Sequence, residues 1–351
     1  MKKTKFSSYS LNGISEGCKL CVRGEKSVLF IGGRCSRNCW YCSLSDFRKK
    51  TNKIFINERP VKKIKEIIEE IKESNSNGVG VTGGDPLINL NKTLKILREL
   101  RKNFGKKFHI HIYLPLNLVR EKKLRKLSFY VDEVRFHPSI FLKKDEKVIN
   151  DEIEKIKKAS MIFNKKIGIE LPCLPNKEKA IISFIQKIED FISFVNINEF
   201  EISETNQKKI ENKFKLNKDT YTIKNSLETG KKILKYLEKK KTKLRVHLCS
   251  AETKDLYQLR NRFLRRKILP FGKRLKNGNV VYFVVFENPK ENIKKIRGIT
   301  KNIFFDKERK RILIKMEDVS EVYEKTDLKI ARVEEQPVFG NEIIEIQWIE
   351  K

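Results

Sequence analysis

Short strand patterns alternate with helical patterns along the first 250 residues of this 351-residue chain. Buried strands are expected at residues 27–33, 78–82, 107–114, 131–136, 166–171, 193–202 and 243–248. Helices are expected at residues 61–72, 89–101, 118–127, 146–162, 177–191 and 219–239. Each connection between parallel strands needs a crossover helix, so the alternation predicts an α/β fold with a parallel sheet. A full or partial parallel (β/α) barrel fits best, and a doubly wound sheet is the rival.

The pattern changes after Cys249. Residues 251–267 form a basic helical pattern, and strand-like runs follow at residues 280–286, 310–316 and 342–349. Asn277–Gly278 is typical of a hairpin turn. We therefore expect an N-terminal segment at residues 1–26, a barrel at residues 27–254 and a small α+β domain at residues 255–351.

Cysteine spacing provides the main chemical signal. The chain has seven cysteines, and five of them lie within 25 residues: Cys18, Cys21, Cys35, Cys39 and Cys42. Such a cluster indicates metal binding rather than disulfides. The segment CSRNCWYC, at residues 35–42, places a C-x3-C-x2-C loop directly after the first expected strand. Three thiolates can ligate three irons of a [4Fe–4S] cluster and leave the fourth iron open.

Zinc is the alternative for this loop. A structural zinc site takes four ligands, usually as two C-x2-C pairs, which this spacing matches poorly. If the loop were structural, the chain would be a zinc-stabilised nucleic-acid-binding protein without catalysis.

The cysteine loop resembles the signature of the radical S-adenosylmethionine (radical SAM) superfamily, C-x3-C-x-aromatic-C, with Tyr41 in the aromatic position. The segment TGGDP at residues 82–86 resembles the Gly-Gly-Glu-Pro motif of that family, with Asp85 in place of Glu. The segment IGIE, which ends at Glu170, resembles a third family motif only loosely. The residues before the first strand, GCKLCVRGEKSVLF, resemble an archaeal-type branch related to pyruvate formate-lyase activating enzymes.

This resemblance implies a barrel of the radical SAM type that binds a [4Fe–4S] cluster on Cys35, Cys39 and Cys42. It implies an oxygen-sensitive oxidoreductase that cleaves S-adenosylmethionine (SAM) reductively to a 5′-deoxyadenosyl radical and abstracts hydrogen from a substrate. The substrate is a protein or a small molecule, with glycyl-radical activation as one version, and the electron donor is a ferredoxin or flavodoxin. The residues expected near the cofactor are Tyr41, Gly83, Gly84, Asp85, Pro86, His111, His137, Glu170, Glu204 and Asn206.

A second metal site is also predicted. Cys18 and Cys21 form a C-x2-C pair, and His247 and Cys249 end the seventh expected strand. In a nearly closed barrel the seventh strand lies near the first, so these four side chains could meet around zinc or an auxiliary iron–sulfur cluster. The alternative is that they are unconnected.

The high positive charge of the chain suggests a second hypothesis, a radical SAM enzyme that modifies RNA. The net charge is +33, and an arginine-rich segment contains Arg260, Arg262, Arg265 and Arg266. Lysines outnumber arginines and are spread over every helix, which is typical of solvated faces. No apolar run of about 18 residues and no signal peptide is present, so we expect a cytoplasmic protein without a membrane partner.

Overall fold

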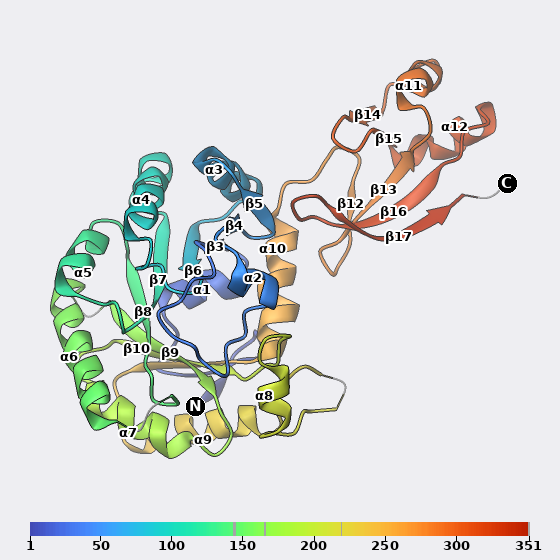
Figure 1. The fold of residues 1–351 in the computed structure, drawn as a ribbon. Coiled ribbons are helices and arrows are strands. Elements are labelled where there is room, and N and C mark those ends of the chain that lie inside the picture. The colour runs from blue at the N-terminus through green and yellow to red at the C-terminus, as the bar shows by residue number, and fades with distance from the viewer. Residues whose placement is uncertain (143–144, 165, 219, 350–351) are drawn as a thin grey trace. The chain divides into compact units, whose positions relative to one another are not determined.

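The computed structural model describes residues 1–142, 145–164, 166–218 and 220–349. The chain divides into two compact units, each of which has its own sheet (Figure 1). Unit 1 comprises Met1–Lys72 and Ser76–Leu259, and unit 2 comprises Glu73–Asn75 and Arg260–Lys351.

Unit 1 is built on an 11-stranded, mostly parallel sheet. In order of pairing, its strands are β1 (Lys2–Lys3), β2 (Tyr9–Leu11), β11 (Arg245–Cys249), β10 (Phe194–Glu199), β9 (Ile167–Cys173), β8 (Glu133–His137), β7 (His109–Pro115), β6 (Gly78–Thr82), β3 (Lys26–Phe30), β4 (Ile54–Ile56) and β5 (Arg59–Val61). All pairs from β11 to β3 are parallel, whereas β2 and β4 add antiparallel pairs at the two ends. The first and last parallel strands, β3 and β11, do not pair with each other, so the sheet is open. The expected α/β architecture is thus confirmed as a partial barrel.

Helices cover the outer face of this sheet (Figure 1). They are α3 (Ile64–Glu73), α4 (Leu90–Phe104), α5 (Glu121–Ser128), α6 (Glu146–Ile162), α7 (Glu178–Ile188) and α9 (Ser226–Lys239). Alternate strand residues such as Val79, Val81, Ile110 and Ile112 are fully buried in the core that the sheet shares with the apolar faces of these helices. Among the described residues, no helix combines the length and the apolar character needed to cross a membrane.

The inner face of the sheet is polar, because the other set of alternate residues points there. His111, Arg135, Asn196 and His247 are all buried on this side. Helix α1 (Glu16–Val22) lies against it. A Cβ atom at Gly17 would stand 2.6 Å from Arg135 Nη2 and 2.6 Å from His111 Nδ1, so only glycine permits this approach.

Several sequence predictions need correction. Residues 219–225 were expected to begin a long helix, but α9 begins at Ser226, after Asn225 adopts a left-handed conformation with φ 68°; Asp219 lies outside the described residues. The basic helix expected at residues 251–267 begins as the π-helix η1 (Thr253–Leu259) and continues as α10 (Arg260–Arg265). Helices α1, α2 (Asp46–Lys50) and α8 (Gln207–Glu211) were not predicted.

Unit 2 contains a 6-stranded antiparallel sheet. Its elements are β12 (Lys273–Arg274), β13 (Val280–Val285), α11 (Pro289–Arg297), β14 (Ile303–Asp306), β15 (Arg311–Ile314), η2 (Met316–Asp318), α12 (Val319–Lys325), β16 (Ala331–Gln336) and β17 (Glu342–Trp348). The predicted turn at Asn277–Gly278 joins β12 to β13, and Gly278 adopts φ 94°. The α+β character expected for this part of the chain is therefore confirmed.

Candidate functional site

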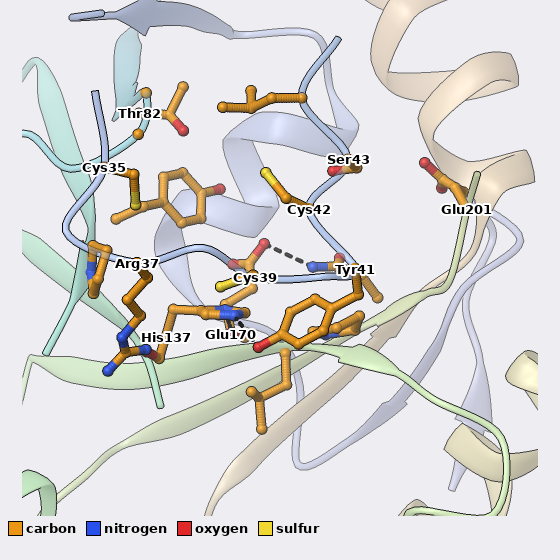
Figure 2. Close-up of a pocket in the computed structure, with 18 of the residues that line it drawn as sticks. Cys35, Arg37, Cys39, Tyr41, Cys42, Ser43, Thr82, His137, Glu170 and Glu201 are labelled. Carbon is orange, nitrogen blue, oxygen red and sulfur yellow. Dashed lines mark hydrogen bonds between the residues drawn. The ribbon is translucent and has the colours of Figure 1, made fainter. Parts of the chain in front are cut away.

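A cavity of about 300 Å³ lies where the parallel strands of unit 1 end. The three thiols of the cysteine loop, Cys35, Cys39 and Cys42, all line it (Figure 2). The ends of five strands contribute further lining residues, among them Thr82, Pro115, His137, Leu171 and Asn198. The carboxyl ends of parallel strands are the usual place for ligand sites in α/β proteins.

The start of the cysteine loop is held against the end of β6. Ser36 Oγ donates to Asp85 Oδ2 at 2.6 Å, and the other carboxylate oxygen accepts from the backbone N–H of Leu87. Gly83 adopts φ +145°, and a Cβ at Gly84 would lie 2.1 Å from the carbonyl oxygen of Arg34. The Gly-Gly pair therefore allows the two backbone segments to pack closely beside the cavity.

The middle of the loop is anchored by a buried ion pair. The Arg37 guanidinium donates to Glu152 Oε1 of α6 and to the carbonyl oxygen of His137, and its Nε donates to Asn117 Oδ1 at 2.6 Å. Both members of the Arg37–Glu152 pair are only 3% exposed. The second oxygen of Glu152 accepts from the backbone N–H of Ser139 at 2.9 Å. The loop is thereby tied to the region between β8 and α6.

The end of the loop is held by Tyr41 and His137. The Tyr41 hydroxyl lies 3.0 Å from His137 Nε2, and His137 Nδ1 donates to the carbonyl oxygen of Glu170 at 2.9 Å (Figure 2). Burial lowers the pKa of His137 to about 4, so the ring is neutral at physiological pH. The hydrogen bond from Nδ1 to the Glu170 carbonyl oxygen fixes the tautomer with the proton on Nδ1. The unprotonated Nε2 then accepts a hydrogen bond from the Tyr41 hydroxyl.

The segment between β10 and α9 clamps the same loop from the other side. Asn206 is fully buried, and its Nδ2 donates to the carbonyl oxygens of Tyr41 and Glu201 while its Oδ1 accepts from Ser203 N. The Thr205 hydroxyl donates to the carbonyl oxygen of Leu44. This segment therefore supports the backbone that carries Cys42.

Aromatic packing reinforces this clamp. The Trp40 ring stacks on Phe214 with centroids 6.3 Å apart and planes at 12°. The ammonium group of Lys213 lies 4.4 Å from the centroid of the Trp40 ring. The residue between Cys39 and Tyr41 is thus fixed by contacts outside the cavity.

Glu170 forms part of the cavity lining nearest the inner face of the sheet. Its Oε1 accepts from Asn198 at 2.9 Å, and its Oε2 accepts from Arg135 at 2.9 Å and from Asn196 at 3.1 Å. With both oxygens partnered, this carboxylate is held in one orientation. A second charged pair, Lys254 of η1 with Glu201, also lines the cavity.

The donor chemistry fits an iron–sulfur cluster. Burial raises the pKa of Cys35 and raises that of Cys39 to about 11, so iron must displace a proton when it binds these thiols. In the described part of the chain, no three His, Cys, Asp or Glu side chains are grouped so that they could hold one metal ion. A cluster contains several irons and takes thiolates that stand farther apart than the ligands of a single ion. Three thiols around one cavity match the cluster better.

The predicted cofactor residues divide into two groups. Five line the cavity: Tyr41, Gly83, Gly84, His137 and Glu170. Asp85 instead holds the cysteine loop through Ser36, and the carbonyl oxygen of Pro86 accepts from the Thr93 hydroxyl of α4.

The other three predicted residues are not among those that line the cavity. His111 is buried below the cavity near α1. Glu204 is exposed and is not among the lining residues. Both polar atoms of the Asn206 side chain form hydrogen bonds with backbone groups. This side chain therefore stabilises the fold of the chain around the cysteine loop.

Sequence reasoning missed Arg37, Glu152, Lys254 and Glu201. Arg37 lies inside the C-x3-C interval, and Glu152 is the buried acidic residue of a helix whose other acidic residues, Glu146, Asp151 and Glu154, are exposed. A buried acid at an apolar position of a helical pattern is a usable signal, since such residues need a partner. Lys254 carries no comparable signal, because a π-helical turn places it.

Comparisons with known proteins agree with this site. Residues 29–162 match the radical SAM superfamily profile. A protein of Methanocaldococcus jannaschii, named as a candidate glycyl-radical enzyme activating enzyme, is 38% identical over 267 residues, which cover 75% of this chain and 70% of that protein.

Two solved structures of TsrM, a radical SAM methyltransferase from Kitasatospora setae, are also similar. The structure with tryptophan and a SAM analogue has a TM-score of 0.37 and 11% identity over 54% of this chain and 40% of that one. The structure with cobalamin and a [4Fe–4S] cluster has a TM-score of 0.36 and 10% identity over 53% and 36%.

The segment that matches the superfamily profile, residues 29–162, includes the loop that brings Cys35, Cys39 and Cys42 to one cavity. The family implies a [4Fe–4S] cluster and SAM as cofactors. This chain belongs to the radical SAM superfamily of enzymes.

Proposed function

We propose that this enzyme activates a partner protein by abstracting a hydrogen atom from one of its glycine residues. The observation that carries the proposal is the 38% identity with the M. jannaschii protein named as a candidate glycyl-radical enzyme activating enzyme. The identity extends over 75% of the present chain.

The residues of the chain have separable tasks in this proposal. Cys35, Cys39 and Cys42 would hold the cluster, and Gly83 and Gly84, which line the same cavity, would help to bind SAM. When bound, the two cofactors supply a 5′-deoxyadenosyl radical.

The remaining cavity residues orient these groups. The Arg37–Glu152 pair fixes the interval between the first two cysteines, and neutral His137 fixes Tyr41 without adding charge. Glu170 and the Lys254–Glu201 pair form a polar wall whose charges are already compensated.

RNA modification is less well supported. Arg266 is 8% exposed, and Arg260 Nε donates to the carbonyl oxygen of Lys276 at 2.7 Å. Guanidinium groups that serve the fold in this way are poorly placed to bind phosphate.

The test uses the full chain after anaerobic reconstitution with iron and sulfide. Dithionite and SAM are added together with a glycine-containing peptide that carries α,α-dideuterioglycine, or with bulk transfer RNA. We expect 5′-deoxyadenosine that contains deuterium from the peptide, and none from the Cys35→Ala/Cys39→Ala/Cys42→Ala variant. The matched control is Cys173→Ala, which removes a buried thiol at the end of β9 outside the cavity.

Stimulation of 5′-deoxyadenosine formation by RNA but not by peptide would favour the RNA-modifying alternative. Cluster formation without any SAM cleavage would contradict both.

A further inference from the structure

A second set of metal-binding side chains lies on the inner face of the sheet, behind the cavity. We propose that Cys18, Cys21, His247 and Cys249 bind an auxiliary iron–sulfur cluster there. Cysteine thiolates hold such clusters, and histidine replaces cysteine at some of them. The proposal does not depend on the substrate of the enzyme.

Helix α1 and strand β11 bring the four residues to the same place. Cys18 and Cys21 are three residues apart on α1 and so share one helix face. On β11, Leu248 faces the outer helices, because a Cβ at Gly230 of α9 would lie 2.5 Å from its side chain. Its neighbours His247 and Cys249 therefore face the inner side.

One ion pair and one shared neighbour link these two elements. Glu16 Oε1 of α1 lies 4.0 Å from Arg245 Nη1 of β11. Cys18 Sγ lies 3.5 Å from Asn196 Oδ1, and Asn196 is the register partner of His247 on the adjacent strand.

His247 is the independent observation that points to a ligand. Its side chain is 1% exposed, and within the described chain neither Nδ1 nor Nε2 has a hydrogen-bond partner. Leaving buried polar atoms unpaired is costly, so native structures rarely do it. Coordination of one nitrogen to iron removes part of that cost.

Two side chains are placed to stabilise thiolates at this site. Arg135 Nη2 donates to Cys18 Sγ at 3.4 Å, and Gln258 Nε2 donates to Cys249 Sγ at 3.4 Å. N–H donors to cluster sulfurs and a nearby positive charge favour the deprotonated, metal-bound form. Arg135 is buried and carries that charge.

The ligand types favour a cluster over a single zinc ion. Iron–sulfur clusters take cysteine thiolates and, at some sites, histidine, whereas one zinc ion needs its ligands at about 2.0–2.3 Å in a tight tetrahedron. Among the described residues, no three His, Cys, Asp or Glu side chains are grouped so that they could hold one ion.

Arg135 also connects the two sites. It binds Cys18 through Nη2 and binds the cavity residue Glu170 through Nη1 at 2.9 Å. The proposed cluster thus lies one layer of side chains behind the lining of the catalytic cavity.

The decisive sample is the full-length Cys35→Ala/Cys39→Ala/Cys42→Ala variant after anaerobic reconstitution. We expect it to keep iron and acid-labile sulfide, with the brown absorption of a cluster. Adding Cys18→Ala and Cys21→Ala should remove both, whereas adding Cys173→Ala should not. Adding His247→Ala should shift the electron paramagnetic resonance g values of the remaining cluster, a change that a purely structural residue would not cause.

A triple variant without iron and sulfide, or with zinc and no labile sulfide, overturns the proposal. The triple variant tests the proposal even if the Cys18/Cys21 variants fail to fold, because it keeps all four residues of the second site. Its result is also independent of SAM cleavage, so it is distinguishable from failure of the proposed function.

Discussion

Arg37 Nη2 of the cysteine loop binds Glu152 Oε1 of helix α6, and each of the two side chains is only 3% exposed. The pair joins the interval between Cys35 and Cys39 to a helix more than a hundred residues away in sequence. The position of the cluster thiols thus depends on packing between β8 and α6 as well as on the loop itself.

Glu152→Ala should destabilise the protein, because it leaves the Arg37 guanidinium buried without its counter-charge. Loss of one partner of a buried ion pair costs about 3–5 kcal/mol. We expect a lower urea midpoint and less iron retained after reconstitution. Glu154→Ala is the matched control, since Glu154 is exposed on the same helix. Equal midpoints for the two variants would contradict this role of the pair.

Asn206→Ala should loosen the loop from the opposite side. The substitution leaves the carbonyl oxygen of Tyr41 and the N–H of Ser203 without their partner, at a cost of about 1–3 kcal/mol for a buried group. Faster loss of iron to a chelator is the measurement. The exposed Asn212 supplies the control variant Asn212→Ala, which should lose iron at the wild-type rate. If Asn206 contacted a cofactor instead, SAM affinity would fall while iron retention stayed unchanged.

Gly84→Ala should disturb the junction between β6 and the cysteine loop. The new Cβ would lie 2.1 Å from the carbonyl oxygen of Arg34, so one of the two backbone segments must move. Overpacking of this kind costs about 1–3 kcal/mol. We expect a lower thermal midpoint and weaker SAM binding. Gly298→Ala, where the nearest atom is 3.3 Å from the new Cβ, should change neither.

Acidification should destabilise the metal-free chain through its histidines. Burial lowers the pKa of His109, His137 and His247 from 6.5 to about 4, and it lowers that of His111 as well. Between these values the unfolded chain binds protons that the folded chain does not. The contribution of the neutral histidines to the free energy of unfolding therefore falls as the pH falls from about 6.5, and it is fully lost below about 4.

A shift of this size corresponds to up to about 3 kcal/mol for each histidine. The measurement is the thermal midpoint of the metal-free protein between pH 7 and pH 5. His137→Gln should flatten the profile, because glutamine does not titrate. Parallel profiles for wild type and variant would show that His137 is not buried in its neutral form.

The sequence by itself determined the class of fold and which three thiols line one cavity. Helical spacing in α3 and α6 and the uninterrupted apolar run of β6 are local patterns, and burial on one or both faces follows from them. The thiols of the C-x3-C-x2-C loop are adjacent in the chain, so their convergence on one cavity needs no knowledge of distant contacts.

Only the tertiary structure decided which distant residues complete the site. Glu152, Asn206 and Lys254 reach the cavity or its loop from three different connections of the barrel, and no local pattern encodes those distances. The sequence also suggested that Cys18 would meet His247 because a closed barrel joins its first and last strands. The sheet is open, and helix α1 on its inner face brings Cys18 to the register partner of His247 instead. Local propensity sets the elements, whereas side-chain packing between elements far apart in sequence sets where their polar groups meet.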